Sequence, residues 1–481
     1  MRPTRFLFAG GALSLGLAAF GALGACHPST PATVTEDASP PPTASGPAYN
    51  ASFHPLDSDG HVLRDAQGRS VILRGYNIKV NGIFDVTPDN GDPVREIIPP
   101  LDATDLLLMQ KSGVNVIRLP VSWSAFEPQK GAYQASYLAA IEAFLNVVRP
   151  YGIYVLLDFH EDGWSKDICE DGAPAWATVV TDDSGAAIPG GDCHTFPAAL
   201  SAHQNFFEQN ADDLEDAFSD MFVRFASYFV NDDLVFAYEI FNEPIASDES
   251  VDAFSIKIAK AIRTVDPRHL ILWEPSSLRN QVNSSFVSPT PFPVPGCVYA
   301  IHVYETVPGV IAYSMQNAVV EAQAWGEPLF ITEHGASPAA DGGISWIGYT
   351  LDQFDQALAS SMDWIWNPGI VTRSDAGAIQ YVDDGGLYAE LTRPYAMAVG
   401  GDLTDTTWDG TTLTVSFQDH PGVPLTHDVY WNRGTPKVTC DGEAVTNVTS
   451  DPVREAYTVA CGTGGGLPDG GGHTLVFASS D

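Results

Sequence analysis

The stretch from Tyr238 to Pro244 ends an apolar run with an amide and a carboxylate. Asn242 and Glu243 come directly before Pro244, which stops the run because a proline nitrogen has no hydrogen to donate to a sheet. The proline also restricts Glu243 to extended or turn geometry. A carboxylate at the carboxyl end of a buried strand can act as a general acid, a base or a nucleophile in a pocket. The alternative is a polar strand exit with no chemistry.

Several other apolar runs also end in residues that can do chemistry. These residues are Asn77 and Lys79, Arg118, His160 with Asp162, Trp273 with Glu274, His302 and Tyr304, Glu333 with His334, and Trp364 with Trp366. Carboxylates can serve as acid and nucleophile, aromatic faces can hold sugar rings, and amides and imidazoles can bind hydroxyls, so the set suits glycosidic-bond cleavage. Taken singly, the arginine could form a strand-end ion pair, a histidine could be a core imidazole, and a tryptophan could be plain packing.

The elements that must position these residues alternate along the chain. Eight apolar runs have the pattern of buried parallel strands: Val71–Ile78, Val114–Val121, Tyr154–His160, Val235–Glu243, His269–Pro275, Val298–Tyr304, Pro328–His334 and Met362–Asn367. Helical patterns separate most of them, at Asp102–Ser112, Ala135–Arg149, Asp212–Val230, Val251–Val265, Tyr313–Trp325 and Thr350–Ser361. This alternation predicts an α/β fold, a (β/α)8 TIM barrel over residues 51–395, with its active site at the carboxyl ends of the strands.

Five segments resemble glycoside hydrolase family five, in this order along the chain. They are NVIRLPVSW at 115–123, LDFH at 157–160, FNEP at 241–244, HVY at 302–304 and ITEHG at 331–335. Two further segments, DGAPAWA at 171–177 and TRPYAMAVGG at 392–401, are similar to the endoglycoceramidases of that family. The resemblance covers about residues 51–480. It implies a retaining β-glycosidase that cuts between the glycan and the ceramide of a glycosphingolipid.

The resemblance also implies a role for each matching residue. Glu333 matches the nucleophile and Glu243 the acid/base. The others match substrate-binding or supporting positions: Asn242 at the 2-hydroxyl, Arg118 and His160 beside the carboxylates, His302 and Tyr304 orienting Glu243 and Glu333, Trp364 or Trp366 under the sugar, and Lys79 and Asp162 at the sugar next to the lipid. Glu161 departs from the pattern, because those relatives more usually carry glutamine there, and this leaves the glycan preference open. The double displacement requires no metal or organic cofactor.

The two ends of the chain differ from the barrel pattern. Arg2 and Arg5 precede an apolar run that closes on small residues before Cys26, which predicts a signal peptide of the lipoprotein type over residues 1–25. Residues 26–50 are rich in Pro, Ser and Thr and are expected to be a disordered tether. Residues 396–481 alternate with period two between Gly, Pro and Asp turns, which predicts a small C-terminal β-sandwich domain.

Composition limits the partners and the compartment. With 60 acidic and 23 basic residues the formal charge is -37, which disfavours nucleic acid and anionic lipid surfaces. Membrane contact is expected only through a lipid anchor at Cys26, on a monomer exported to the cell envelope or secreted. The five later cysteines predict two disulfides, with Cys169 near Cys193 and Cys440 near Cys461, and one buried thiol at Cys297. No cysteine or histidine spacing is typical of zinc ligands.

Two alternatives to the glycolipid hydrolase remain open from the sequence. An endo-β-glucanase or an aryl or alkyl β-glucosidase of the same family would need a cleft open on both sides of the carboxylates, whereas a ceramide enzyme needs an apolar groove on one side. Pro289–Pro295 and Val307–Ile311 are candidates for the lining of such a groove. A non-catalytic, surface glycan-binding lipoprotein is the alternative from another class. Two carboxylates in one pocket argue against it, because a binding module has no need for their mutual repulsion.

Overall fold

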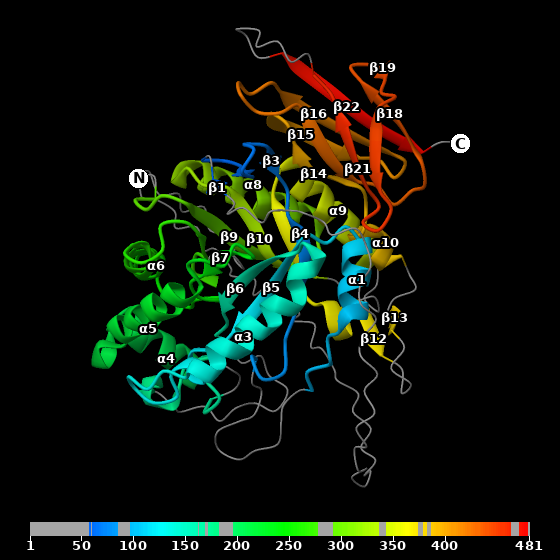
Figure 1. Cartoon of the computed structure of the whole chain (residues 1–481). Helices are drawn as coiled ribbons and strands as arrows, with labels where there is room; N and C mark the ends of the chain where they lie inside the picture. Colours follow the sequence, from blue (N-terminus) through cyan, green and yellow to red (C-terminus); the bar gives the residue numbers. More distant parts are fainter. Residues whose placement is uncertain are drawn as a thin grey trace, which may run out of the picture.

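The computed structural model describes most of the chain after residue 56 (Figure 1). The described residues are 57–58, 60–84, 97–161, 163–168, 172–181, 196–277, 292–335, 343–373, 379–381, 386–462 and 471–479. The predicted signal peptide, the tether and Asp162 lie outside them, as do Cys169 and Cys193. Among the helices of the described part, none has the length and apolar character needed to cross a bilayer.

Eight parallel strands close into a barrel, which confirms the predicted fold class. In chain order the strands are β4 (Arg74–Asn77), β5 (Val116–Val121), β6 (Tyr154–Phe159), β7 (Val235–Glu239), β8 (Leu270–Trp273), β9 (Cys297–Val303), β10 (Leu329–His334) and β11 (Ser360–Asp363). Each strand pairs with its sequence neighbours, and β11 closes the ring against β4. Two of the predicted runs shift: Val71 belongs to another sheet, and the eighth strand ends at Asp363 instead of Asn367.

Helices cover the outside of the barrel (Figure 1). They are α1 (Ala103–Lys111), α2 (Trp123–Phe126), α3 (Ala135–Val148), α4 (Pro197–Phe207), α5 (Leu214–Phe229), α6 (Asp248–Arg263), α8 (Pro308–Trp325), α9 (Gly343–Gln356) and α10 (Leu387–Leu391), with short turns η1 (Arg149–Tyr151), η2 (Ala175–Ala177), η4 (Ala211–Asp213) and η5 (Trp366–Ile370). Asp102 caps α1 reciprocally with Asp105, as its acidic start predicts. The helix predicted at Thr350–Ser361 is wrong at its end, because Ser360 and Ser361 are strand residues. α4 was not predicted.

Two antiparallel sheets lie together at one end of the barrel (Figure 1). The five-stranded sheet contains β15 (Asp402–Trp408), β16 (Thr412–Gln418), β22 (Gly472–Ser479), β18 (Pro436–Cys440) and β19 (Glu443–Ala444). The seven-stranded sheet contains β1 (Asp57–Ser58), β2 (Leu63–Arg64), β3 (Ser70–Val71), β14 (Tyr395–Val399), β17 (Thr426–Tyr430), β21 (Ala456–Ala460) and β20 (Val448–Asp451). A short hairpin, β12 (Val371–Arg373) with β13 (Ile379–Tyr381), stands apart. The sandwich therefore draws three strands from residues that precede the barrel.

The seven-stranded sheet closes the amino-terminal end of the barrel. Leu63, Val71 and Ala398 from this sheet form one buried cluster with side chains from seven of the barrel strands, among them Phe236 and Phe330. Because these residues fill the end opposite the strand termini, the catalytic face stays clear of the sandwich.

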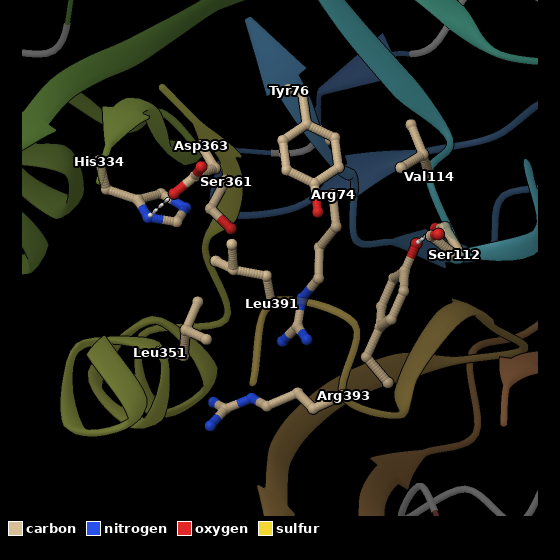
Figure 2. A pocket seen from close by; sticks show the side chains of 13 residues that line it. Arg74, Tyr76, Ser112, Val114, His334, Leu351, Ser361, Asp363, Leu391 and Arg393 are labelled. Carbon is tan, nitrogen blue, oxygen red and sulfur yellow. Dashed lines mark hydrogen bonds and ion pairs between the residues drawn. The ribbon is translucent and has the colours of Figure 1, made fainter. Parts of the chain in front are cut away.

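Two buried arginines connect the sandwich to the barrel. Figure 2 shows Arg74 of β4 and Arg393, just before β14, among the side chains that line a cavity of about 20 Å³. Both guanidinium groups donate to Asp355 of α9. The shared carboxylate offsets the repulsion between the two cations, so the junction holds three elements with one buried network.

The cysteines of the described residues agree with the predicted oxidised state. Cys440 and Cys461 form a disulfide between β18 and the end of β21, with Cα atoms 5.6 Å apart. Cys297 is a buried free thiol. The predicted bridge between Cys169 and Cys193 falls outside the described residues.

The barrel plug gives a stability prediction. Phe330→Ala removes a fully buried ring that stacks on Phe236, so the free energy of unfolding should fall by about 3–5 kcal/mol in denaturant titration. Leu107→Ala, at an exposed position of α1, is the matched control and should change it by less than about 1 kcal/mol. Equal losses in the two variants would contradict the assignment of Phe330 to the core.

Candidate active site

Arg118 lies at the centre of the barrel, beneath the ends of the strands. It is fully buried, and its guanidinium donates to Glu333 Oε1 at 2.5 Å, Glu239 Oε2 at 2.5 Å and Asn242 Oδ1 at 2.8 Å. It also donates to Asn77 and lies 3.1 Å from Asp158 and 3.7 Å from Glu274. One arginine from β5 thereby fixes side chains from five other strands or strand ends. The sequence prediction that it supports the carboxylates agrees with the position it occupies.

Glu333 occupies the end of β10 through a local irregularity of that strand. The pairing register with β9 shifts between Ile331 and Glu333. Counting alternate residues from the inward-facing Phe330 would put Thr332, and not Glu333, on the barrel interior. The extra residue reverses this alternation and brings Glu333 to Arg118. Its second oxygen accepts from the Tyr304 hydroxyl at 2.7 Å. Two donors therefore stabilise a negative charge on this carboxylate, as a nucleophile requires.

Glu243 lies just beyond β7 and has a different environment. Its φ is 44°, in the left-handed region that non-glycine residues seldom adopt, between Asn242 and the restrictive Pro244. Such strain is tolerated where the surrounding structure fixes the side chain. Glu243 Oε1 lies 2.6 Å from His302 Nδ1, and its side chain is 15% exposed, whereas Arg118 is fully buried. The position gives Glu243 access to a substrate oxygen and a proton-carrying partner.

His302 connects Glu243 to the buried carboxyl group of Glu274. Its Nε2 lies 3.2 Å from Glu274 Oε1, on the side opposite Glu243. Burial by itself would lower the pKa of His302, but the charges of Glu274 and Glu333 raise that pKa well above its ordinary value. The surrounding carboxylates therefore favour the protonated form of His302, whose two ring nitrogens face Glu243 and Glu274. Burial also raises the pKa of Glu274.

The pocket holds more carboxyl groups than cations. Glu239 is buried against Arg118, and burial raises its pKa to about 8 despite that ion pair. At neutral pH some of these buried carboxyl groups consequently keep their protons. Sequence analysis assigned no role to Asp158 and Glu239. For Asp158 the sequence does contain a signal. It precedes His160 by two residues, so both side chains lie on the same face of the strand.

The same groups could in principle hold a cation. Ligand atoms of Glu243, His302 and Glu333 lie within 4.8 Å of one another, and so do those of Glu239, Glu274 and His302. Both sets need His302 as a neutral ligand. The neighbouring carboxylates raise the pKa of His302 and so favour its protonated form, which suits proton transfer.

An aromatic wall borders the carboxylates. Trp364 stacks on His160, with ring centroids 5.4 Å apart and planes at 11°. Lys79 Nζ lies 5.1 Å from the centroid of the Trp364 ring. His160 Nδ1 is 2.8 Å from Asp158, which fixes the imidazole that supports this wall. A partly exposed indole of this kind can form a platform for a sugar ring.

Trp366 is not part of this wall, which corrects its prediction as a substrate-binding residue. It is fully buried, packs on Tyr76 and donates its indole N–H to Asp105 of α1 at 3.1 Å. The prediction treated Met362–Asn367 as one strand whose end faced the pocket. The strand instead ends at Asp363, and the turn that follows carries Trp366 into the core.

Three other residues at the predicted strand ends are not seen in the pocket. His334 leaves the pocket and faces Asp363 across 3.4 Å beside the cavity of Figure 2. Glu161 is buried beneath the 172–181 segment, where a Cβ added at Gly172 would lie 2.4 Å from its Oε2. Asp162 lies outside the described residues, so its role stays a prediction.

Comparison with known proteins identifies the family. The model of the cellulase family, glycosyl hydrolase family 5, matches residues 65–369, which is more than half of the chain. The chain belongs to glycosyl hydrolase family 5. This result confirms the family suggested by the sequence segments.

Several endoglycoceramidases are similar to this chain. An endoglycoceramidase of Cyanea nozakii is 30% identical over 46% of this chain and 50% of its own length. Endoglycoceramidase I of Rhodococcus hoagii is 25% identical over 72% of this chain and 73% of its own. The chain thus spans about half the length of the Cyanea protein and of a similar one from Hydra vulgaris. The solved structure of endo-glycoceramidase II from Rhodococcus sp. shares the fold, with 23% identity, a TM-score of 0.73, and coverage of 88% of this chain and all of that chain.

A pH prediction follows from the Glu274–His302 contact. Glu274→Gln removes a negative charge that favours proton binding by His302 and, through repulsion, by Glu243. Both groups should then lose protons at lower pH, so the alkaline limb of kcat/KM should move down by about one pH unit.

The control for this prediction is Glu327→Gln. Glu327 is also buried, and burial raises its pKa to about 8, but it bonds to Trp273 and does not touch His302. Its variant should keep the alkaline limb in place. An alkaline limb that Glu274→Gln leaves unmoved would mean that Glu274 does not influence proton binding by His302 or Glu243.

Proposed function

We propose that this family 5 protein is a retaining β-glycosidase that hydrolyses the bond between the glycan and the lipid of glycosphingolipid-like substrates. The observation that carries the proposal is the placement of Glu243 and Glu333 together at the Nδ1 side of His302, with oxygen atoms of the two carboxylates within 4.8 Å. This separation suits a double displacement, because an inverting mechanism needs carboxyl groups about 6.5–9.5 Å apart to admit a water molecule.

In the first step Glu333 attacks the anomeric carbon. The glycosidic bond breaks as the bond to Glu333 forms, and Glu243 gives its proton to the departing oxygen of the lipid alcohol. In the second step Glu243 takes a proton from water, whose oxygen attacks the same carbon and releases Glu333. Glu243 ends protonated again, and the sugar keeps its anomeric configuration. His302 supports the ionised state of Glu243 that follows proton transfer, because its Nδ1–H can donate to that carboxylate.

The glycolipid substrate is supported by the similarity to endoglycoceramidases. Three endoglycoceramidases match, and the pocket combines a charged, polar interior with the partly exposed Trp364. An endoglucanase of Clostridium saccharobutylicum is also similar, over 29% of this chain, so an endo-β-glucanase or a β-glucosidase is the second candidate. Hydrolysis of lactosylceramide without cleavage of cello-oligosaccharides, read by mass spectrometry, would distinguish them.

Export and anchoring are part of the same proposal. A signal peptide ending before Cys26 would place the enzyme at the cell envelope, where glycolipids are accessible. A Cys26→Ser variant cannot be lipidated at this position. Its appearance in the medium, with the wild-type protein retained at the cell envelope, would support a lipid anchor.

The catalytic roles lead to opposite outcomes for two alanine variants. Glu243→Ala should slow substrates with poor leaving groups by roughly 10²–10⁴-fold and retain much of the glycosylation rate on nitrophenyl glycosides, whose leaving group needs no proton. Azide should restore turnover of Glu243→Ala and give the β-glycosyl azide. With Glu333→Ala no glycosyl-enzyme forms, so azide should give the α-azide.

The anomers are read by NMR, and wild type with azide is the control. An α-azide from Glu243→Ala would show that the two roles are exchanged. Inversion by the wild-type enzyme would reject the retaining mechanism altogether.

A further inference from the structure

Exposed apolar side chains gather on the connection that leaves the catalytic face after β9. Eleven large hydrophobic residues are exposed in the described part of the chain, and five of them fall between Tyr304 and Val320. At the start of α8, Val307 is 57% exposed, Val310 is 38% and Tyr313 is 49%. Scattered exposed apolar residues are ordinary, but a cluster of them in one short segment marks an interaction surface.

The segment also lacks charge. Residues 306–320 contain no Asp, Glu, Lys, Arg or His, in a chain that is 17% charged and carries a formal charge of -37. A helix at a protein surface normally pairs an apolar inner face with a polar outer face. Here the inner face presents the buried Ile311 and Met315, and the outer face presents Val310 and Tyr313. The beginning of α8 is thus apolar on both faces.

The segment is held firmly beside the pocket. Tyr304, at its start, bonds to Glu333, and the next residue, Glu305, accepts a hydrogen bond from Ser314 at 2.5 Å. Val310 and Ile311 donate their backbone N–H groups to the carbonyl of Val307. Pro308 at the first turn suits a helix start. These bonds fix the exposed apolar residues at the catalytic face, while the sandwich occupies the opposite end of the barrel.

We propose that Val307, Val310 and Tyr313 form a docking surface for a zwitterionic lipid bilayer, which the protein enters to a shallow depth while the sugar headgroup reaches Glu243 and Glu333. The chemistry selects a neutral surface, because the negative charge of the protein repels anionic lipids and the segment contains no base to bind phosphate. The inference rests on the proposed glycolipid substrate. It adds a membrane contact that is independent of any anchor at Cys26.

The test is flotation of the protein without residues 1–26 on phosphatidylcholine vesicles that contain no glycolipid. Val307→Asp and Val310→Asp should each weaken vesicle binding by roughly tenfold, the value of one buried valine side chain. Both variants should fold, since aspartate is favourable at the N-cap and in the first turn of a helix. Val453→Asp, an equally apolar and 37% exposed site in the sandwich, is the matched control and should bind as wild type does.

Four further results decide between this proposal and its rivals. Wild-type protein that fails to bind the vesicles, or equal binding by Val307→Asp, overturns it. Slower turnover of a soluble nitrophenyl glycoside by Val307→Asp would place the segment in the catalytic pocket and also overturn it. Self-association of the wild type that Val307→Asp abolishes, seen by sedimentation velocity, would make the surface a contact between copies of the chain.

Failure of the docking surface and failure of the proposed function are distinguishable. Cleavage of glycolipid in detergent micelles without vesicle binding retains the glycolipid hydrolase and rejects the docking surface. Vesicle binding that depends on Val307, with no cleavage of glycolipid in either form, retains the docking surface and rejects the substrate.

Discussion

The buried guanidinium of Arg118 is the constraint on which the active site depends. A cation without access to water is stable only when its donors are paired, and here they are paired by carboxylates and amides from strands that are distant in sequence. Each partner is fixed in turn. Removing the arginine would leave several buried carboxyl groups facing one another, so the same residue holds the pocket together and sets its charge.

The surplus of acids around that arginine produces the chemical asymmetry of the pocket. Glu333 accepts hydrogen bonds from a guanidinium and a phenol, and both stabilise an anion. Glu243 instead shares a proton-bearing imidazole with Glu274. Two chemically identical side chains are therefore prepared for different tasks by the groups that surround them, in agreement with the general logic of paired carboxylates.

The arrangement of the whole molecule separates stability from catalysis. At the amino-terminal end, Phe330 and its neighbours seal the barrel against the sandwich, and Arg74 and Arg393 fasten the two together through Asp355. At the carboxyl-terminal end, polar side chains from the strand ends line the pocket, and the uncharged apolar start of α8 lies beside them. A substrate with a sugar headgroup and a lipid tail would meet a polar and an apolar surface side by side.

The sequence by itself determined the barrel and the family and indicated Glu243 and Glu333 as carboxylates at strand ends, because buried parallel strands have an apolar period and their polar ends are local signals. Only the tertiary structure decided what depends on register and on distant packing. The shift within β10 turns Glu333 inward against simple alternation, the early end of β11 carries Trp366 into the core, and β1, β2 and β3 join a sheet formed mostly by the last part of the chain. These features arise from pairing between segments far apart in the chain, and local periodicity carries no record of such pairing.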